Sequence, residues 1–230
     1  MIMKKLTVLF LCMSILSAAL AGCGSKEGTA PAADSTSAEA PEETAGTEAE
    51  EAETDESEEA AADLLSGLHH AEIEIADYGT IALELDADTA PISVTNFVNL
   101  AKDGFYDGLT FHRIISGFMI QGGDPLSDGT GGSEQSIKGE FKNNGIENDI
   151  SHVRGVISMA RAMDPDSGSS QFFIVHEDST FLDGDYAAFG HVTEGIEIVD
   201  QICEDTQVQD DNGTVAAEDQ PTITSIKVID

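Results

Sequence analysis

Basic side chains are scarce in this sequence. Its 230 residues include 10 Lys and Arg against 44 Asp and Glu, which gives a formal net charge of −34 at pH 7. Proteins that bind nucleic acids present basic surfaces to the phosphates, so this balance argues against a nucleic-acid partner. The same charge repels anionic membrane surfaces over a Debye length.

Tryptophan is absent, and cysteine is nearly so. Cys12, Cys23 and Cys203 are too few and too widely spaced for a disulfide framework or a thiolate metal site. The Gly-x-x-x-x-Gly-Lys-Ser/Thr pattern of nucleotide sites and the Gly-x-Ser-x-Gly pattern of hydrolases are also missing. His69 and His70 are adjacent, and in a strand they point to opposite faces. We therefore expect no metal and no cofactor.

The N-terminus has the layout of an export signal. Lys4 and Lys5 precede an uncharged apolar run over residues 6–21. The run ends in Leu20-Ala21-Gly22-Cys23, which resembles the lipobox of bacterial lipoproteins. The resemblance implies that residues 1–22 are removed and that Cys23 carries the lipids, because several acyl chains anchor a protein stably. We expect an extracytoplasmic protein, lipid-anchored to the bacterial cell membrane; the alternative is an ordinary signal peptide with an incidental Cys.

The next segment has the composition of a disordered acidic linker. Residues 24–66 hold 14 acidic side chains, one Lys and no aromatic residue, and they are otherwise mostly Ala, Thr, Ser, Gly and Pro. Such a segment buries too little apolar surface to offset its chain entropy. We expect residues 23–66 to be a spacer, although an acidic recruiting arm remains an alternative. Residues 67–230 are long enough for one domain.

After Gly67 the hydrophobic pattern becomes that of short strands. Residues 71–75 and 80–85 alternate with period two around Tyr78-Gly79, which predicts a hairpin. A helix follows, with Asp88 or Thr89 as its cap, Pro91 in the first turn and Gly104 as its end. Further short apolar strands are predicted over residues 109–115, 118–122, 156–160, 172–175 and 222–229, and a second helix over residues 195–203. Many strands with two helices favour an all-β barrel or sandwich.

The densest candidate site lies in residues 111–124. If both halves are strands, Phe111, Arg113 and Ile115 share one face. By the same alternation Phe118 and Ile120 share one face of the second strand, with Met119 and Gln121 on the other. A guanidinium, an amide and apolar side chains on one surface suit a mostly apolar ligand with one carbonyl group. Taken singly, these residues also fit a surface ion pair or ordinary core positions.

This segment resembles the cyclophilin family of peptidyl-prolyl isomerases. The resemblance runs from about His70 to Asp230 and also rests on residues 158–162, 169–174, 181–184 and 188–192. It implies a mainly β fold, a closed eight-stranded antiparallel barrel capped by two α-helices. It also implies an enzyme that rotates X-Pro bonds in proline-containing polypeptides, acting as a monomer.

Several site residues follow from the resemblance by matching position. Arg113 would be the catalytic guanidinium and Gln121 its hydrogen-bonding companion. Residues expected to line or border the substrate groove are Phe118, Met119, Ala160, Arg161, Gln171, Phe172 and Leu182, together with Phe181 and Tyr186 where the best-known eukaryotic members have Trp and His. With the export signal, this implies an isomerase that assists the folding of exported proteins; the alternative is a non-catalytic peptide-binding or chaperone module.

Overall fold

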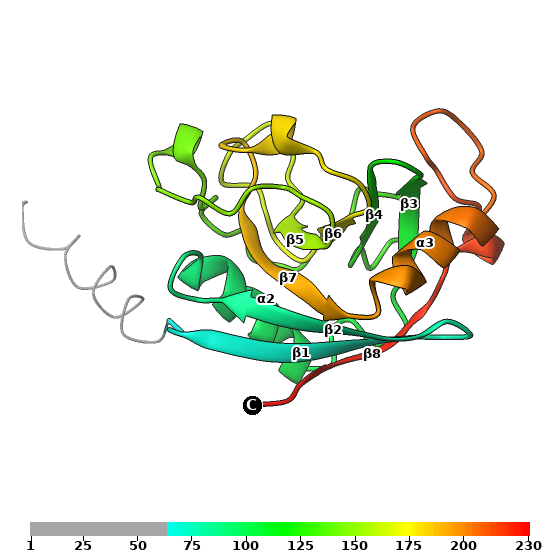
Figure 1. Ribbon diagram of the computed structural model, residues 1–230, viewed down its shortest axis with the longest axis horizontal. Coiled ribbons are helices and arrows are strands. Elements are labelled where there is room, and N and C mark those ends of the chain that lie inside the picture. The colour runs from blue at the N-terminus through cyan, green and yellow to red at the C-terminus, as the bar shows by residue number, and fades with distance from the viewer. Residues whose placement is uncertain (1–63) are drawn as a thin grey trace, which may run out of the picture. The chain divides into compact units, whose positions relative to one another are not determined.

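The computed structural model describes residues 64–230. Its strands are β1 (Leu68–Ile75), β2 (Gly79–Asp86), β3 (Phe111–Ile115), β4 (Met119–Gly122), β5 (Val156–Met159), β6 (Phe172–Val175), β7 (Ala188–Glu194) and β8 (Ile223–Val228). Its α-helices are α2 (Pro91–Lys102) and α3 (Ile196–Asp205), and a short 3₁₀ helix, η2 (Thr180–Leu182), becomes important at the site. Figure 1 shows their arrangement.

Three sequence predictions fall outside the described residues. They are the signal peptide over residues 1–22, the lipidated Cys23, and most of the acidic linker over residues 23–66. Within residues 64–230, no helix is long and apolar enough to cross a membrane.

The eight strands form one antiparallel sheet in the order β3-β4-β6-β5-β7-β2-β1-β8. The two ends of this order meet beside β3 and β8, where Thr110 bridges Thr222. Ile223 N donates to Leu109 O at 2.7 Å, and Gly108 N donates to Ile223 O at 2.8 Å. The predicted eight-stranded antiparallel fold with two helices is confirmed, as a curled sheet whose edges join along this short seam.

Both helices bury one face against the inside of the curled sheet. Helix α2 contributes Val94, Phe97 and Val98 to the core, and α3 contributes Val199 and Ile202. The ring of Phe97 lies 5.5 Å from Phe172 and 5.3 Å from Phe189, centroid to centroid. Burying each such ring contributes about 1.5–3 kcal/mol. Helix α2 follows β2 after Asp86, and α3 lies beside Gly79 at the other end of that strand. The two helices therefore lie at opposite ends of the β1–β2 hairpin (Figure 1).

The N-terminus of α2 corrects one sequence prediction. Neither Asp88 nor Thr89 caps the helix; the N-cap is Ala90, which makes no side-chain cap hydrogen bond. Instead the carboxylate of Glu140 accepts hydrogen bonds from Ile92 N at 2.9 Å and from Ser93 N at 2.8 Å. These are two of the N–H groups at a helix start that have no partner within the helix. A negative charge there also interacts favourably with the positive end of the helix dipole.

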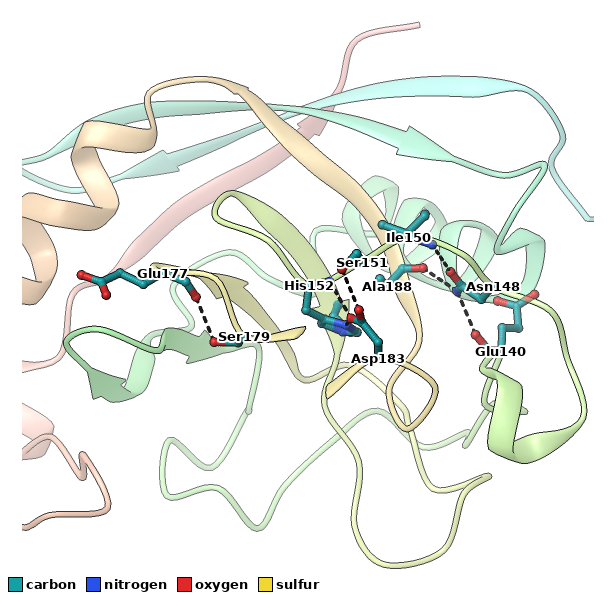
Figure 2. A network of polar contacts seen from close by, with 10 residues as sticks. Glu140, Asn148, Ile150, Ser151, His152, Glu177, Ser179, Asp183 and Ala188 are labelled. Atoms are coloured by element: carbon teal, nitrogen blue, oxygen red, sulfur yellow. Dashed lines mark hydrogen bonds and ion pairs between the residues drawn. The ribbon is translucent and has the colours of Figure 1, made fainter. Parts of the chain in front are cut away.

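The backbone of Glu140 is held in turn by the side chain of Asn148. The side-chain nitrogen of Asn148 donates both to Glu140 O at 2.9 Å and to Ala188 O of β7 at 2.8 Å, as Figure 2 shows. The cap of α2 is therefore fastened to the sheet through one amide group.

The strands β3 and β4 correct a second prediction. The register between them shifts between Phe111 and Arg113, which pair with Gly122 and Gln121. This irregularity breaks the alternation, so Phe111 is buried in the main core while Arg113 lies on the outer face. Phe118 and Ile120 likewise separate: Ile120 joins the main core, and Phe118 packs in an outer cluster with Met119.

Candidate active site

An apolar pocket of about 320 Å³ opens on the outer face of the sheet. Strands β3 and β4 form one side, the ends of β5 and β6 form its floor, and η2 with the loop after it forms the other side. The residues that line this apolar pocket are Arg113, Phe118, Met119, Gln121, Ala160, Arg161, Phe173, Phe181, Leu182 and Tyr186. Ten residues from distant parts of the chain thus meet around one cavity.

Buried apolar side chains make the floor of the apolar pocket. Met119 is 1% exposed, Phe173 5% and Leu182 8%. The Tyr186 ring stands edge-on to Phe173 at 5.9 Å between centroids. Phe181 lies at the rim, 72% exposed, with its ring 5.6 Å from that of Phe118. A compact apolar group would fit among these side chains with little loss of hydrogen bonds.

Arg113 supplies the cation at the edge of the apolar pocket. Its Nη1 donates to Gln121 Oε1 at 3.1 Å and lies 3.9 Å from Met119 Sδ. Its Nε donates to Asn212 O at 2.8 Å. Partial burial lowers the pKa of Arg113, while Tyr186 and Asp210 act in the opposite direction. The guanidinium nevertheless stays protonated at pH 7, because the ordinary pKa of Arg exceeds 12.

A second, polar pocket of about 330 Å³ adjoins the first. The two share Gln121, Ala160 and Arg161. Gln171 lines the polar pocket and not the apolar one; its Oε1 accepts from Gln121 Nε2 at 2.8 Å, and its Nε2 donates to Gly131 O at 2.7 Å. A chain of three side chains, from Arg113 through Gln121 to Gln171, therefore runs along the boundary between the pockets.

Arg161 braces the wall between the two pockets. Its guanidinium carbon lies 4.8 Å from the centroid of the Tyr186 ring and 5.1 Å from that of Phe141. Its Nε donates to Asp185 O at 2.9 Å, and its Nη1 donates to Ala162 O at 2.9 Å. Since two aromatic rings and two carbonyl oxygens hold the guanidinium, its contact with Tyr186 helps to fix that ring in place.

The structure corrects one predicted site residue. Phe172 does not line the apolar pocket: it is fully buried in the main core, where its ring meets those of Phe97 and Tyr106 edge-on. The next residue, Phe173, points outward and forms the floor of the pocket. Successive side chains of a strand face opposite ways, so an assignment one residue off selects the wrong face.

A polar network that runs from the buried Ser158 and His152 to the surface at Asp183 supports the apolar pocket from behind (Figure 2). The imidazole of His152 stacks on Phe173 at 6.0 Å, and its Nδ1 lies 2.8 Å from Asp183 Oδ1. Asp183 follows η2 directly and also accepts from Ser151 Oγ at 2.6 Å and from His152 N at 2.7 Å. His152 Nε2 lies 3.0 Å from Ser158 Oγ on β5. One ring thus connects the floor of the pocket with the wall that bears Leu182.

Sequence reasoning missed three residues of this site. Phe173 was adjacent to the residue predicted, and only the burial of its neighbour distinguishes the two. Asn212 contacts Arg113 from 99 positions away, in an Asp-Asn-Gly turn whose sequence signals only a turn. His152 is one of several histidines, and its Ser-His-Asp neighbourhood exists only in the fold.

Comparison with known proteins identifies the class. Residues 70–228 match the family described as "Cyclophilin type peptidyl-prolyl cis-trans isomerase/CLD". A peptidyl-prolyl cis-trans isomerase of Helicobacter pylori is 50% identical over 126 residues, covering 54% of this chain and 74% of the relative. Peptidyl-prolyl cis-trans isomerase B of Bacillus subtilis is 49% identical over 123 residues, covering 54% and 82%.

Solved structures agree with the sequence matches. A cyclophilin-type isomerase of Cryptosporidium parvum superposes with a TM-score of 0.63 at 28% identity, covering 71% of this chain and 99% of that one. A second crystal structure of that isomerase, in the presence of the dipeptide Ala-Pro, gives 0.62 at 30% identity over 70% and 99%. The chain belongs to the cyclophilin-type peptidyl-prolyl cis-trans isomerases. It catalyses cis-trans rotation of X-Pro bonds, and its substrates are proline-containing peptides.

Proposed function

We propose that Arg113 carries the catalysis, assisted by Gln121, and that the apolar pocket holds the proline ring. The observation behind this proposal is a guanidinium fixed by Gln121 and Asn212 at the edge of an apolar cavity. Met119, Leu182 and Phe173 would enclose the ring, with Phe118 and Phe181 at the rim. Ala160 and Arg161 would border the neighbouring peptide by backbone contact, with Gln171 and Tyr186 beside them.

The chemistry needs only this much. An X-Pro bond prefers trans by about 0.5–1 kcal/mol, and its rotation is slow because amide resonance gives a barrier of about 20 kcal/mol. In the twisted amide the prolyl nitrogen regains its lone pair and becomes a better acceptor. Arg113 donates to that nitrogen or holds the neighbouring carbonyl, while the pocket keeps the ring still. Each tenfold in rate requires about 1.4 kcal/mol of preference for the twisted state.

The test is the cis-to-trans rate of an Ala-Pro peptide with wild type, Arg113→Ala and Gln121→Ala in the full chain. We expect a loss of about 100-fold or more in Arg113→Ala, as for the removal of other electrostatic donors, and a smaller loss in Gln121→Ala. Far-ultraviolet circular dichroism controls for folding. A folded Arg113→Ala protein with the full rate contradicts the assignment.

We further propose that the protein works outside the cytoplasm, lipid-anchored through Cys23, and assists the folding of exported proteins with slow prolines. Lys4, Lys5, the apolar run over residues 6–21 and the sequence Leu20-Ala21-Gly22-Cys23 support this location. Mass spectrometry and membrane fractionation of wild type and Cys23→Ala test the anchor. A Cys23→Ala protein that is still lipidated and membrane-bound contradicts it.

The client role has its own experiment. In a strain that lacks the protein, we expect slower acquisition of protease resistance by newly exported proteins, and complementation by wild type but not by Arg113→Ala. Unchanged folding of exported proteins in the deletion strain contradicts this role.

A further inference from the structure

A turn over residues 210–214, here called the Asp210 turn, holds the guanidinium of Arg113 from outside the apolar pocket. Arg113 Nε donates to Asn212 O at 2.8 Å, and Nη2 donates to Asn212 Oδ1 at 3.4 Å. Since Nη1 donates to Gln121, all three guanidinium nitrogens have partners, and two of these bonds go to Asn212. None of the residues of the Asp210 turn lines the apolar pocket.

The side chain of Asp210 makes three hydrogen bonds within the turn. Its Oδ1 accepts from Asn212 N at 3.0 Å and from Thr214 N at 3.1 Å, and its Oδ2 accepts from Thr214 Oγ1 at 2.9 Å. Hydrogen bonds from the backbone and side chain of Thr214, with others in the turn, hold the pKa of Asp210 below its usual value. At neutral pH the carboxylate is therefore a charged acceptor for three donors, which strengthens each bond.

The turn is attached to β3 by bonds that do not involve Asp210. Ile114 N donates to Gly213 O at 2.8 Å, and Val215 N donates to His112 O at 3.0 Å. Loss of the Asp210 side chain would therefore leave the segment docked beside β3, and the backbone bonds Gly213 N to Asp210 O at 3.1 Å and Gln209 N to Thr214 O at 2.7 Å would remain. It would remove the three side-chain bonds that further restrain the backbone around Asn212. The position of Asn212 O relative to Arg113 Nε depends on that backbone.

A long, half-buried Arg side chain needs such support. It has many rotamers when free, and a guanidinium displaced by about 1 Å can lose on the order of 100-fold in rate. We propose that Asp210 is a positioning residue for isomerisation: it shapes the turn through which Asn212 orients Arg113. This inference rests on the proposed catalytic role of Arg113.

The chain offers a matched control in Asp86. Its Oδ1 accepts from Asp88 N and Thr89 N, both at 3.0 Å, and its Oδ2 accepts from Thr89 Oγ1 at 2.7 Å. Both carboxylates thus accept two backbone N–H groups and one Thr hydroxyl, but Asp86 is the last residue of β2 and lines neither pocket.

The experiment compares Asp210→Ala, Asp210→Asn and Asp86→Ala with wild type in the full chain. Exchange NMR at several concentrations of an Ala-Pro peptide gives kcat and KM, and thermal unfolding gives stability. For Asp210→Ala we expect kcat to fall about tenfold with KM unchanged, because roughly one hydrogen bond's worth of support to the guanidinium is lost. Asp210→Asn, which keeps an acceptor oxygen, should recover most of kcat, and Asp86→Ala should keep the wild-type kcat.

The same substitution in an Arg113→Ala background separates this inference from the proposed function. With Arg113 absent, Asp210→Ala should cause no further loss. If Arg113→Ala alone retains the full rate, the proposed catalytic role fails. If Arg113→Ala is inactive while Asp210→Ala keeps the wild-type kcat, or lowers it only as much as Asp86→Ala does, the positioning role is overturned. A further tenfold loss in the double variant overturns it as well.

Discussion

At the scale of single residues, His152 has an arrangement that elsewhere activates a nucleophile. Asp183, His152 and Ser158 form a Ser-His-Asp chain with contacts of 2.8 and 3.0 Å. Ser158, however, is fully buried, and His152 is 1% exposed, so no substrate reaches the hydroxyl. In this protein the chain is structural: it holds η2, β5 and Phe173 together behind the apolar pocket.

Burial makes His152 sensitive to acid. Desolvation lowers the pKa of His152, and the bond to Asp183 opposes this only in part. The unfolded chain, with a His pKa of about 6.5, therefore binds the proton more readily than the folded protein does. The stability due to neutral His152 is present above about pH 6.5 and is lost as the pH falls through the lowered pKa of the folded state.

We predict that the free energy of unfolding falls more steeply in wild type than in His152→Gln between about pH 7 and pH 5. Urea unfolding at several pH values measures this difference. His191→Gln is the control, since that side chain is 53% exposed and its imidazole lies 3.8 Å from Glu84 Oε1 at the surface. Parallel slopes for wild type and His152→Gln would contradict the prediction.

Much of the site was predictable at this scale, and the errors have physical causes. The pairing of Arg113 with Gln121 and the apolar lining by Phe118, Met119 and Leu182 are where the sequence predicts them. Phe172 was wrong because two adjacent Phe residues on a strand cannot be assigned to faces without the sheet. Contacts between residues distant in sequence, such as that of Asn212 with Arg113, leave no local pattern at all.

At the scale of elements, α2 depends on a residue far from it in sequence. Glu140 is 1% exposed and accepts three hydrogen bonds from Ile92 and Ser93. Its carboxylate satisfies backbone groups that would otherwise be buried without partners. The packing of α2 against the sheet, and with it the aromatic core around Phe97, therefore involves the long connection between β4 and β5.

We predict that Glu140→Ala lowers the free energy of unfolding by about 2–3 kcal/mol, because it leaves buried N–H groups unsatisfied. Urea denaturation of the variant against wild type measures the change. Glu134→Ala, at an exposed position in the same segment, should change stability by less than about 0.5 kcal/mol. Equal effects of the two substitutions would show that the bonds of Glu140 to the start of α2 do not stabilise the protein.

Regular alternation predicted most elements but not all. The hairpin, α2 with Pro91 in its first turn, and the end of that helix before Gly104 agree with the structure. Strand β7 follows no such pattern, because Gly190 interrupts it: a Cβ there would collide with the carbonyl oxygen of Glu84 on β2. The prediction that Asp88 or Thr89 caps α2 was wrong because the group that accepts the first N–H bonds is Glu140, 47 residues along the chain from Ser93.

At the scale of the whole molecule, most charged side chains of the domain that bears the site are acidic. Residues 67–230 carry 30 acidic and seven basic side chains. Two of the seven, Arg113 and Arg161, line the apolar pocket and are engaged by neighbouring groups. Asp183 and Asp185 lie in the loop after η2, beside the apolar pocket. Asp210 and Asp211 lie in the turn that contacts Arg113. A cationic peptide therefore approaches through a favourable field, and an anionic one through an unfavourable one.

We predict that kcat/KM is about two- to fivefold higher for an Ala-Pro peptide flanked by Lys than for one flanked by Glu at low ionic strength. The difference should shrink towards unity at about 1 M salt, where the Debye length is about 3 Å. Isomerisation rates of the two peptides across a salt series test this. A preference that persists unchanged in high salt would point to a direct contact instead of the field.

The exposed ring of Phe181 has an optical consequence. The chain has no Trp and only three Tyr, of which Tyr106 is fully buried. Its ultraviolet emission therefore has no indole background. Phe181→Trp would place a single indole at the rim of the apolar pocket, where 72% of the present side chain is open to water. A bound proline peptide would cover that ring and move its emission to shorter wavelength, so occupancy of the pocket could be followed in real time in the unlabelled protein.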